Sequence, residues 1–351
     1  MQQRRTMNAY RNAGVDRNVA KRFIEKLRFR TKILHADKVR HGMGGFAAVL
    51  GMEEGAFLVT STDGIGTKIL VARMAGAYQG LGVDLVAMVV NDLITTGAKP
   101  LFFLDYLAFS SLEENTLDEL TKGLAQGLEA ARMDLVGGET AQMPGMYQDG
   151  LFEFAGFGIG SVPKRALITT DNPAPGDVLV GLASSGLHSN AFTLVRRVLF
   201  EQNHYGIRDR LPELENKPLS EVLLAPTKIY VDAVQRLVAA GIPKGMAHIT
   251  GGGITENLPR MLANNVQAVV ELGSLSVPPL FRWLMEKGQI QEEDALGTFN
   301  MGVGFVVAVS PSRLEEAMEL LGQAGETPSV IGRLAERYPQ GPHIRYEGKL
   351  A

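Results

Sequence analysis

Short apolar runs and helical patterns alternate along the whole chain. The apolar runs are bounded by glycine, proline and other turn residues, which predicts strands over residues 56–60, 101–107, 152–162, 178–182 and 302–310. Apolar positions at helical spacing predict helices over residues 18–30, 81–96, 111–132 and 191–201. A capping box formed by Ser111 and Glu114 is expected to start the third helix. Strands and helices therefore interleave in both halves, which predicts a mixed fold of the α/β or α+β class.

The length of the chain and its turn residues predict two domains. A chain of 351 residues is too long for one ordinary core, because single hydrophobic cores stop growing at roughly 250 to 300 residues. Residues 169–176 form the densest turn segment in the middle of the chain and are the best linker candidate. We expect a mobile arm with a short helix over residues 1–45, one domain over 46–168 and a second over 169–351.

The composition narrows the class of protein. The formal net charge is −3 and no basic stripe interleaved with aromatic residues occurs, so no nucleic-acid partner is expected. No apolar core of signal-peptide length follows the first residues and no run of about 18 apolar residues occurs, so we expect a cytoplasmic protein that does not enter the membrane. The sequence contains no cysteine, which excludes disulfides, thiolate metal sites and sulfur nucleophiles.

Glycine is abundant, at 40 residues, but the two commonest phosphate-binding patterns are absent. The turn Asp-Gly-Ile-Gly-Thr-Lys at residues 63–68 has threonine between glycine and lysine, whereas a Walker loop requires an adjacent Gly-Lys pair. Gly156, Gly158 and Gly160 lack the G-x-G-x-x-G spacing and lie inside an expected strand. We interpret these three glycines as packing residues.

Four turns rich in acidic residues and glycine remain, at residues 62–68, 91–92, 137–140 and 250–253. Each alone is a weak signal, since a lone aspartate in a turn usually caps the local backbone. Together they offer carboxylates from separate elements near a lysine and backbone amides, which is what a magnesium-bound triphosphate requires. Asp84 and Asp92 lie about 80° apart around their predicted helix, so we expect them near one another on one side of it.

A second cluster, Ser-Ser-Gly-Leu-His-Ser-Asn at residues 184–190, lies between a predicted strand and a predicted helix. Side chains and amides there can reach a ligand phosphate or transfer a proton. For His188 a hydrogen bond to nearby backbone is an equally good interpretation. His248 is embedded in an apolar run, which favours a structural role.

Six motifs carry a family resemblance. In chain order they are Asp-Gly-Ile-Gly-Thr-Lys at 63–68, Val-Asn-Asp-Leu at 90–93, Pro-Leu-Phe-Phe-Leu-Asp-Tyr at 100–106, Gly-Gly-Glu-Thr-Ala-Gln-Met-Pro-Gly-Met-Tyr at 137–147, Ser-Gly-Leu-His-Ser-Asn at 185–190 and Thr-Gly-Gly-Gly at 250–253. As a set, over residues 10–333, they resemble the phosphoribosylformylglycinamidine cyclo-ligases, also called aminoimidazole ribonucleotide synthetases. The segment 137–147 is specific to that family, whereas the first two motifs are shared by a wider ATP-binding superfamily.

The resemblance implies an assembly and a reaction. It implies a homodimer whose N-terminal domains join their mixed sheets into a barrel, with an ATP site near the subunit interface and a C-terminal α/β sandwich domain that closes over it. It also implies a step of purine biosynthesis in which ATP and formylglycinamidine ribonucleotide give 5-aminoimidazole ribonucleotide, ADP and phosphate, with Mg²⁺ required.

On this resemblance we assign residues to three tasks. The candidates for ATP are Asp63, Gly64, Gly66, Thr67, Lys68, Asp84, Asp92, Gly138 and Glu139, and the metal ligands among them are Asp63 and Asp92. The candidates for the substrate are Thr140, Ser189, Asn190, Gly251, Gly252 and Gly253. The catalytic candidates are His188, Lys68 and Asp63, with His188 stabilising or protonating the transferring group.

Two features depart from the family pattern or resist alignment with it. Leu187 stands where the family often has proline before the histidine, which alters the turn. In the arm, Arg28 or Lys32 is a candidate cation over the nucleotide, although a solvated helix face explains both equally well.

Other members of the superfamily are less consistent with the sequence. Selenophosphate synthetase and the hydrogenase maturation factor depend on a cysteine or selenocysteine that this sequence lacks. Formylglycinamidine ribonucleotide synthetase is far larger or works with a separate glutaminase. Thiamine-monophosphate kinase needs no cysteine but lacks the Met-Pro-Gly-Met segment at residues 143–146. A non-catalytic, nucleotide-binding assembly factor is an alternative from another class, and substrate-dependent ATP turnover distinguishes it from the ligase.

Overall fold

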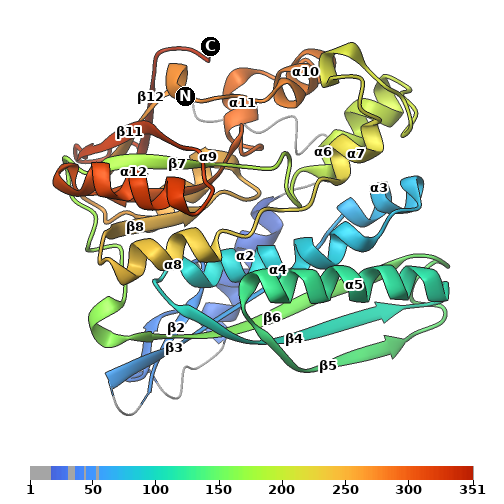
Figure 1. The fold of residues 1–351 in the computed structure, drawn as a ribbon, viewed down its shortest axis with the longest axis horizontal. Coiled ribbons are helices and arrows are strands. Elements are labelled where there is room, and N and C mark those ends of the chain that lie inside the picture. The colour runs from blue at the N-terminus through green and yellow to red at the C-terminus, as the bar shows by residue number, and fades with distance from the viewer. Residues whose placement is uncertain (1–16, 31–35, 43–44, 53–54, 351) are drawn as a thin grey trace.

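The described part of the chain forms two six-stranded sheets with helices between them and beyond the second (Figure 1). The structure, a computed structural model, describes residues 17–30, 36–42, 45–52 and 55–350. The strand order is β1-β2-β3-β6-β4-β5 in the first sheet and β12-β9-β11-β7-β10-β8 in the second. Each sheet mixes parallel and antiparallel pairs, so the predicted mixed fold is confirmed.

The first sheet is built from residues before the predicted linker. Its strands are β1 (Val39–His41), β2 (Ala48–Gly51), β3 (Ala56–Gly64), β4 (Lys99–Phe109), β5 (Asp134–Gln142) and β6 (Phe152–Pro163). Two helices, α4 (Gln79–Ile94) and α5 (Glu114–Ala131), pack together over one face, and α3 (Lys68–Ala75) precedes them. A side chain at Gly156 would overlap Phe103 and one at Gly158 would overlap α4, which confirms that the β6 glycines serve packing.

The second sheet follows the predicted linker. Its strands are β7 (Val178–Ala183), β8 (Pro243–His248), β9 (Val266–Glu271), β10 (Val303–Val309), β11 (Pro328–Glu336) and β12 (Ile344–Glu347). The α-helices of this half are α6 (Phe192–Arg196), α7 (Leu219–Leu224), α8 (Val231–Ala239), α9 (Gly253–Asn257), α10 (Pro279–Gly288), α11 (Glu292–Leu296) and α12 (Leu314–Gln323), and a π-helical stretch Arg197–Gln202 continues α6. Short 3₁₀ turns occupy Lys164–Ala166, Pro212–Leu214, Leu258–Met261, Leu272–Ser274 and Pro311–Arg313.

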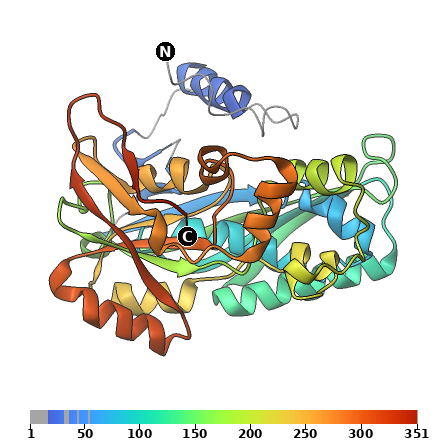
Figure 2. The same cartoon turned by 90° about the horizontal axis from the view of Figure 1, so that it is seen from above.

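Two hydrophobic cores hold these layers together. The first lies between the sheets, where α4 and α5 meet α8 and α12, and the second lies on the far face of the second sheet. Strand β10 is buried along its whole length because alternate residues enter the two cores, Phe305 the first and Val306 the second. The helix α2 (Arg17–Arg30) lies apart from both sheets (Figure 2).

The sequence pattern missed or misplaced several elements. The helix expected from residue 111 begins at Glu114, because the Ser111 hydroxyl donates to Asp149 and forms no capping box. Strands β1, β2, β5, β8, β9, β11 and β12 were not predicted, because they are short or are interrupted by glycine or polar residues. No helix in the described part of the chain is long and apolar enough to cross a membrane.

Candidate active site

The first side of the site is the turn that follows β3. The apolar strand delivers Asp63 to its end, where the Gly64 N–H donates to Asp63 Oδ1 at 2.8 Å. The backbone then turns through Gly66, whose φ of 69° favours glycine, and α3 begins directly after it. The first carboxylate of the site is therefore fixed by local backbone geometry.

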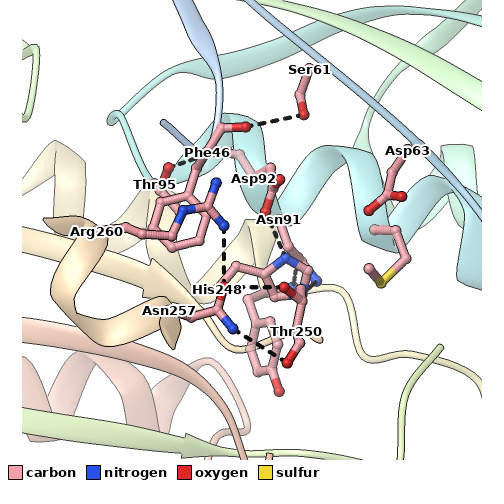
Figure 3. A network of polar contacts seen from close by, with 12 residues as sticks. Phe46, Ser61, Asp63, Asn91, Asp92, Thr95, His248, Thr250, Asn257 and Arg260 are labelled. Atoms are coloured by element: carbon pink, nitrogen blue, oxygen red, sulfur yellow. Dashed lines mark hydrogen bonds and ion pairs between the residues drawn. The ribbon is translucent and has the colours of Figure 1, made fainter. Parts of the chain in front are cut away.

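The second carboxylate comes from the last turn of α4. Asp92 Oδ1 lies 2.9 Å from Nδ1 of His248, which is the last residue of β8 in the second half of the chain. Asn91 Nδ2 lies 3.5 Å from His248 Nε2 on the other side of the ring (Figure 3). Since the amide nitrogen of Asn91 can only donate, this arrangement sets the His248 proton on Nδ1, facing Asp92.

A guanidinium group completes the cluster. Arg260 donates to the Asn257 side chain at 3.1 Å and to the Gly45 carbonyl at 2.5 Å, and it lies 3.8 Å from the centre of the Phe46 ring. Asn257 also accepts a hydrogen bond from Thr250 at 3.3 Å (Figure 3). These contacts hold the cation close enough to interact with both carboxylates.

The electrostatics of the cluster favour a bound cation. Burial and the neighbouring Asp92 together raise the pKa of Asp63 to about 6, although the Gly64 N–H, His248 and Arg260 act in the opposite direction. Two carboxylates that repel each other and are only partly compensated suit Mg²⁺, which takes one or two carboxylates together with phosphate oxygens. Within the described residues, no group of three or more candidate metal-ligating side chains occurs. A magnesium ion here would therefore need oxygens from a ligand.

Both predicted substrate loops of the second half meet this site. Ser189 Oγ donates to the Ile65 carbonyl at 3.0 Å, and Asn190 Nδ2 lies 3.8 Å from the Met88 sulfur on α4. A side chain at Gly251 would touch the Asn190 side chain, and Gly252 has a φ of 106°. Residues 189–190 and 250–253 thus lie along the seam between the two halves, next to the β3 turn.

Three predicted residues, Gly138, Glu139 and Thr140, are not brought to this site within one chain. They lie on β5, the far edge of the first sheet. Asp63 pairs with Gly156, which pairs with Asp105, which pairs with Gly138, so three strand spacings, about 14 Å, separate Asp63 from Gly138. Glu139 and Thr140 are exposed there.

Lys68 and Asp84 also differ from the expectation that they contact ATP. Both side chains are fully buried, and Lys68 Nζ lies 2.7 Å from Asp84 Oδ2. Asp84 and Asp92 do share one side of α4, but eight residues of helix separate them by about 12 Å. Asp84 therefore belongs to a separate buried ion pair.

His188 faces the core. Its ring is fully buried, its Nε2 accepts a hydrogen bond from the Ser185 N–H at 3.2 Å, and its Nδ1 has no hydrogen-bond partner among the described residues. Burial lowers its pKa well below the ordinary value, and nearby His248 and Lys68 lower it further, so the ring is neutral at pH 7. The backbone hydrogen bond considered from the sequence is the contact that the structure shows.

The sequence interpretation missed His248 and Arg260. A sequence signal existed for His248, which stands two residues before the Thr-Gly-Gly-Gly turn, but Arg260 carries none. Lys32 lies outside the described residues, as does the side chain of Arg28.

A cavity of about 850 Å³ lies elsewhere along the seam. Its lining includes Ser184, Ser185, Gly186 and Ala225, but none of the cluster residues Asp63, Asp92, His248 and Arg260. We place the candidate active site at the cluster, because the perturbed carboxylate is there.

Comparisons with known proteins agree with this layout. The fold and the site define a two-domain protein of the AIR synthase related class, whose N-terminal domain matches residues 44–162 and whose C-terminal domain matches residues 174–341. The phosphoribosylformylglycinamidine cyclo-ligase of Thermoanaerobacter pseudethanolicus is 45% identical over 329 residues, which cover 93% of this chain and 97% of that protein. The chain therefore belongs to the phosphoribosylformylglycinamidine cyclo-ligase family and is a ligase.

Solved structures of lower identity share the fold. Thiamine-monophosphate kinase from Stenotrophomonas maltophilia has a TM-score of 0.65 at 20% identity and covers 94% of this chain and 96% of its own. PurL from T. maritima, complexed with AMPPCP, has a TM-score of 0.54 at 17% identity and covers 82% of this chain and 42% of its own. At these identities the likeness concerns the fold alone.

Proposed function

We propose that the protein uses ATP and Mg²⁺ to close the imidazole ring of 5-aminoimidazole ribonucleotide from formylglycinamidine ribonucleotide. The observation that carries the proposal is the pair Asp63 and Asp92, which interact electrostatically with each other and with the Arg260 cation where the two halves of the chain meet. The membership of the cyclo-ligase family and the AMPPCP bound by the related PurL fold support it.

The proposed chemistry solves a leaving-group problem. An amide oxygen is a poor leaving group, so the formyl oxygen first attacks the γ-phosphorus of ATP and ADP departs. The amidine nitrogen then attacks the formyl carbon and loses a proton. The former formyl oxygen leaves as part of inorganic phosphate. Both reacting groups belong to one molecule, so the enzyme accelerates the second step by holding the ring-closing geometry.

The described residues divide this work. Asp63 and Asp92 would hold Mg²⁺, which when bound offsets the charge of the triphosphate oxygens. The amides of Gly64 and Gly66 are available to the phosphates, and Arg260 stabilises charge that develops on the transferred group. Ser189, Asn190 and the glycines 251–253 are proposed to hold the ribonucleotide. His188 braces its loop by accepting from Ser185.

A homodimer would supply the part of the site that one chain lacks. The first sheet leaves one face uncovered by helices (Figure 1), and large apolar side chains are exposed along its strands at Phe102, Leu135, Val136 and Phe157. Pairing of these faces would bury them and bring Glu139 and Thr140 of one subunit to the site of the other. The expected partners are therefore a second copy of the chain and the small-molecule substrate. We also expect a cytoplasmic location.

A coupled assay tests the proposed function. ADP release that depends strictly on formylglycinamidine ribonucleotide, with stoichiometric formation of the aminoimidazole product, is the expected result. ATP hydrolysis that does not respond to the ribonucleotide, or ATP binding without turnover, would contradict the proposal. The Asp118→Asn variant, changed on the exposed face of α5, is the matched control for Asp63→Asn and should retain full activity.

A further inference from the structure

Residues 225–230 connect α7 to α8 and lie against α3 and α4 of the first half, with Thr227 and Tyr230 buried and Pro226 exposed. The Ala225 carbonyl accepts from Lys68 Nζ at 2.9 Å. The Thr227 N–H and hydroxyl both donate to Asp84 Oδ1, at 2.7 and 2.6 Å. This crossing segment from the second half of the chain is thus bound by side chains from the first half.

Asn91 extends the same row of contacts. Its Nδ2 donates to the Lys228 carbonyl at 2.8 Å, and its Oδ1 accepts from the Tyr230 N–H at 3.1 Å. The three clamping side chains, Lys68, Asp84 and Asn91, are all fully buried. Buried backbone groups must find partners, and here the side chains of α3 and α4 provide them.

The Lys68 side chain is fully buried and engaged by the protein itself. Its ammonium group contacts Asp84, the Ala225 carbonyl and the face of the Phe192 ring, whose centre is 5.5 Å away. The lysine of the Asp-Gly-Ile-Gly-Thr-Lys turn therefore faces the crossing segment.

The clamp connects directly to the acidic site. Asn91 precedes Asp92 on α4, and its amide also lies 3.5 Å from the His248 ring, which contacts Asp92. A shift of the crossing segment would displace Asn91, and with it the contact between His248 and Asp92.

We propose that Lys68, Asp84 and Asn91 are positioning residues, which clamp residues 225–230 so that His248 of the second half is held against Asp92 of the first. The activity measurements below depend on the proposed function, whereas the spectroscopic measurement does not.

The decisive comparison is between a single and a double variant. In Lys68→Met the Asp84 carboxylate is left buried without its cation, so the segment shifts. A misplacement of about 1 Å can cost about 100-fold in rate, so kcat should fall by about that factor while KM for Mg-ATP changes less than about threefold. Lys68→Met/Asp84→Asn carries no buried charge and keeps an oxygen for Thr227, so it should recover at least about tenfold of kcat.

A direct phosphate role for Lys68 gives the opposite result. The double variant would then be at least as impaired as Lys68→Met, and KM for Mg-ATP would rise in both. That outcome would overturn the proposal. All rates are measured below the unfolding temperature of the least stable variant and corrected for the folded fraction, so a loss of stability alone does not change kcat.

NMR of the His248 imidazole tests the clamp without any assay of activity. The chain has six histidines, and His248→Gln identifies the signal. The signal should move in Lys68→Met and in the milder Thr227→Val, and return towards the wild-type position in the double variant. Lys122→Met, which breaks an exposed ion pair on α5, is the control and should leave it in place.

The two ideas can fail separately. An unmoved His248 signal in Lys68→Met and Thr227→Val overturns the clamp, whatever the activity. A wild-type protein that releases no ADP with formylglycinamidine ribonucleotide overturns the proposed function and leaves the NMR result to decide the clamp.

Discussion

Helix α4 carries two aspartates with different environments, Asp84 in its second turn and Asp92 in its last turn. Asp92 is 14% exposed, and it faces His248 and shares a site with Asp63. Asp84 is fully buried, where Lys68 lies 2.7 Å from its Oδ2 and Thr227 donates two hydrogen bonds to its Oδ1. A carboxylate that lies near a second carboxylate at the boundary between the two halves is therefore available to a ligand. A carboxylate that is paired with a buried lysine serves the folded structure instead.

The largest effect on activity is expected from removing a negative charge at the site formed by Asp63 and Asp92. Asp63→Asn or Asp92→Asn should reduce kcat/KM by at least about 1,000-fold, because the proposed Mg²⁺ would lose one of its two carboxylate ligands. Steady-state kinetics with varied Mg²⁺ measure this. His188→Ala should retain far more activity than Asp63→Asn. Equal losses in the two variants would restore a catalytic role for His188.

A large effect on stability is expected from breaking the buried ion pair between Lys68 and Asp84. Lys68→Met should lower the free energy of unfolding by about 3 to 5 kcal/mol, since it leaves Asp84 buried and unpaired. Urea denaturation measures the loss. The double variant Lys68→Met/Asp84→Asn should be more stable than the single one, and Lys122→Met should match the wild type. A single variant as stable as the wild type would show that the pair contributes nothing.

The pH dependence of stability tests the environment of Asp63, which belongs to the same site as Asp92. The pKa of Asp63 is raised from 3.8 to about 6 in the folded protein, so its favourable contribution is complete below pH 4 and is lost as the pH rises through 6. The loss amounts to about 3 kcal/mol at most. Without Mg²⁺ and nucleotide, Asp63→Asn should therefore match the wild type near pH 4 and exceed its stability above pH 6. Parallel curves for the two proteins between pH 4 and 8 would refute the raised pKa.

The smallest effect on stability is expected from replacing Arg260. Arg260→Met removes the stacking on Phe46 and the hydrogen bonds to Gly45 and Asn257, which should cost about 1 to 2 kcal/mol of stability. It also removes a cation that lowers the pKa of Asp63, so that pKa should rise. Arg260→Lys keeps the charge and should preserve the pKa while losing the stacking. A pKa of Asp63 that is unchanged in Arg260→Met would place the guanidinium outside the site.

Local signals predicted much of the first half correctly. The apolar runs that became β3, β4 and β6 are long and bounded by turns, and the residues of α4 repeat at helical spacing, so pattern alone located them. Strands β8 and β11 contain glycine and charged residues and are defined by their neighbours in the sheet. The residues of the candidate site differ in the same way. Local turn motifs pointed to Asp63 and Asp92, whereas no local signal pointed to Arg260.

Local sequence patterns located the longer strands and helices of the first half, the strand end that presents Asp63, and the motifs that place the chain in its family. Only the tertiary structure decided which charges meet. His248 reaches Asp92 across 156 residues of chain, and the sheet order moves Glu139 to the far edge. The physical reason is that burial and partners set the role of a charge, and both come from segments that are distant in sequence.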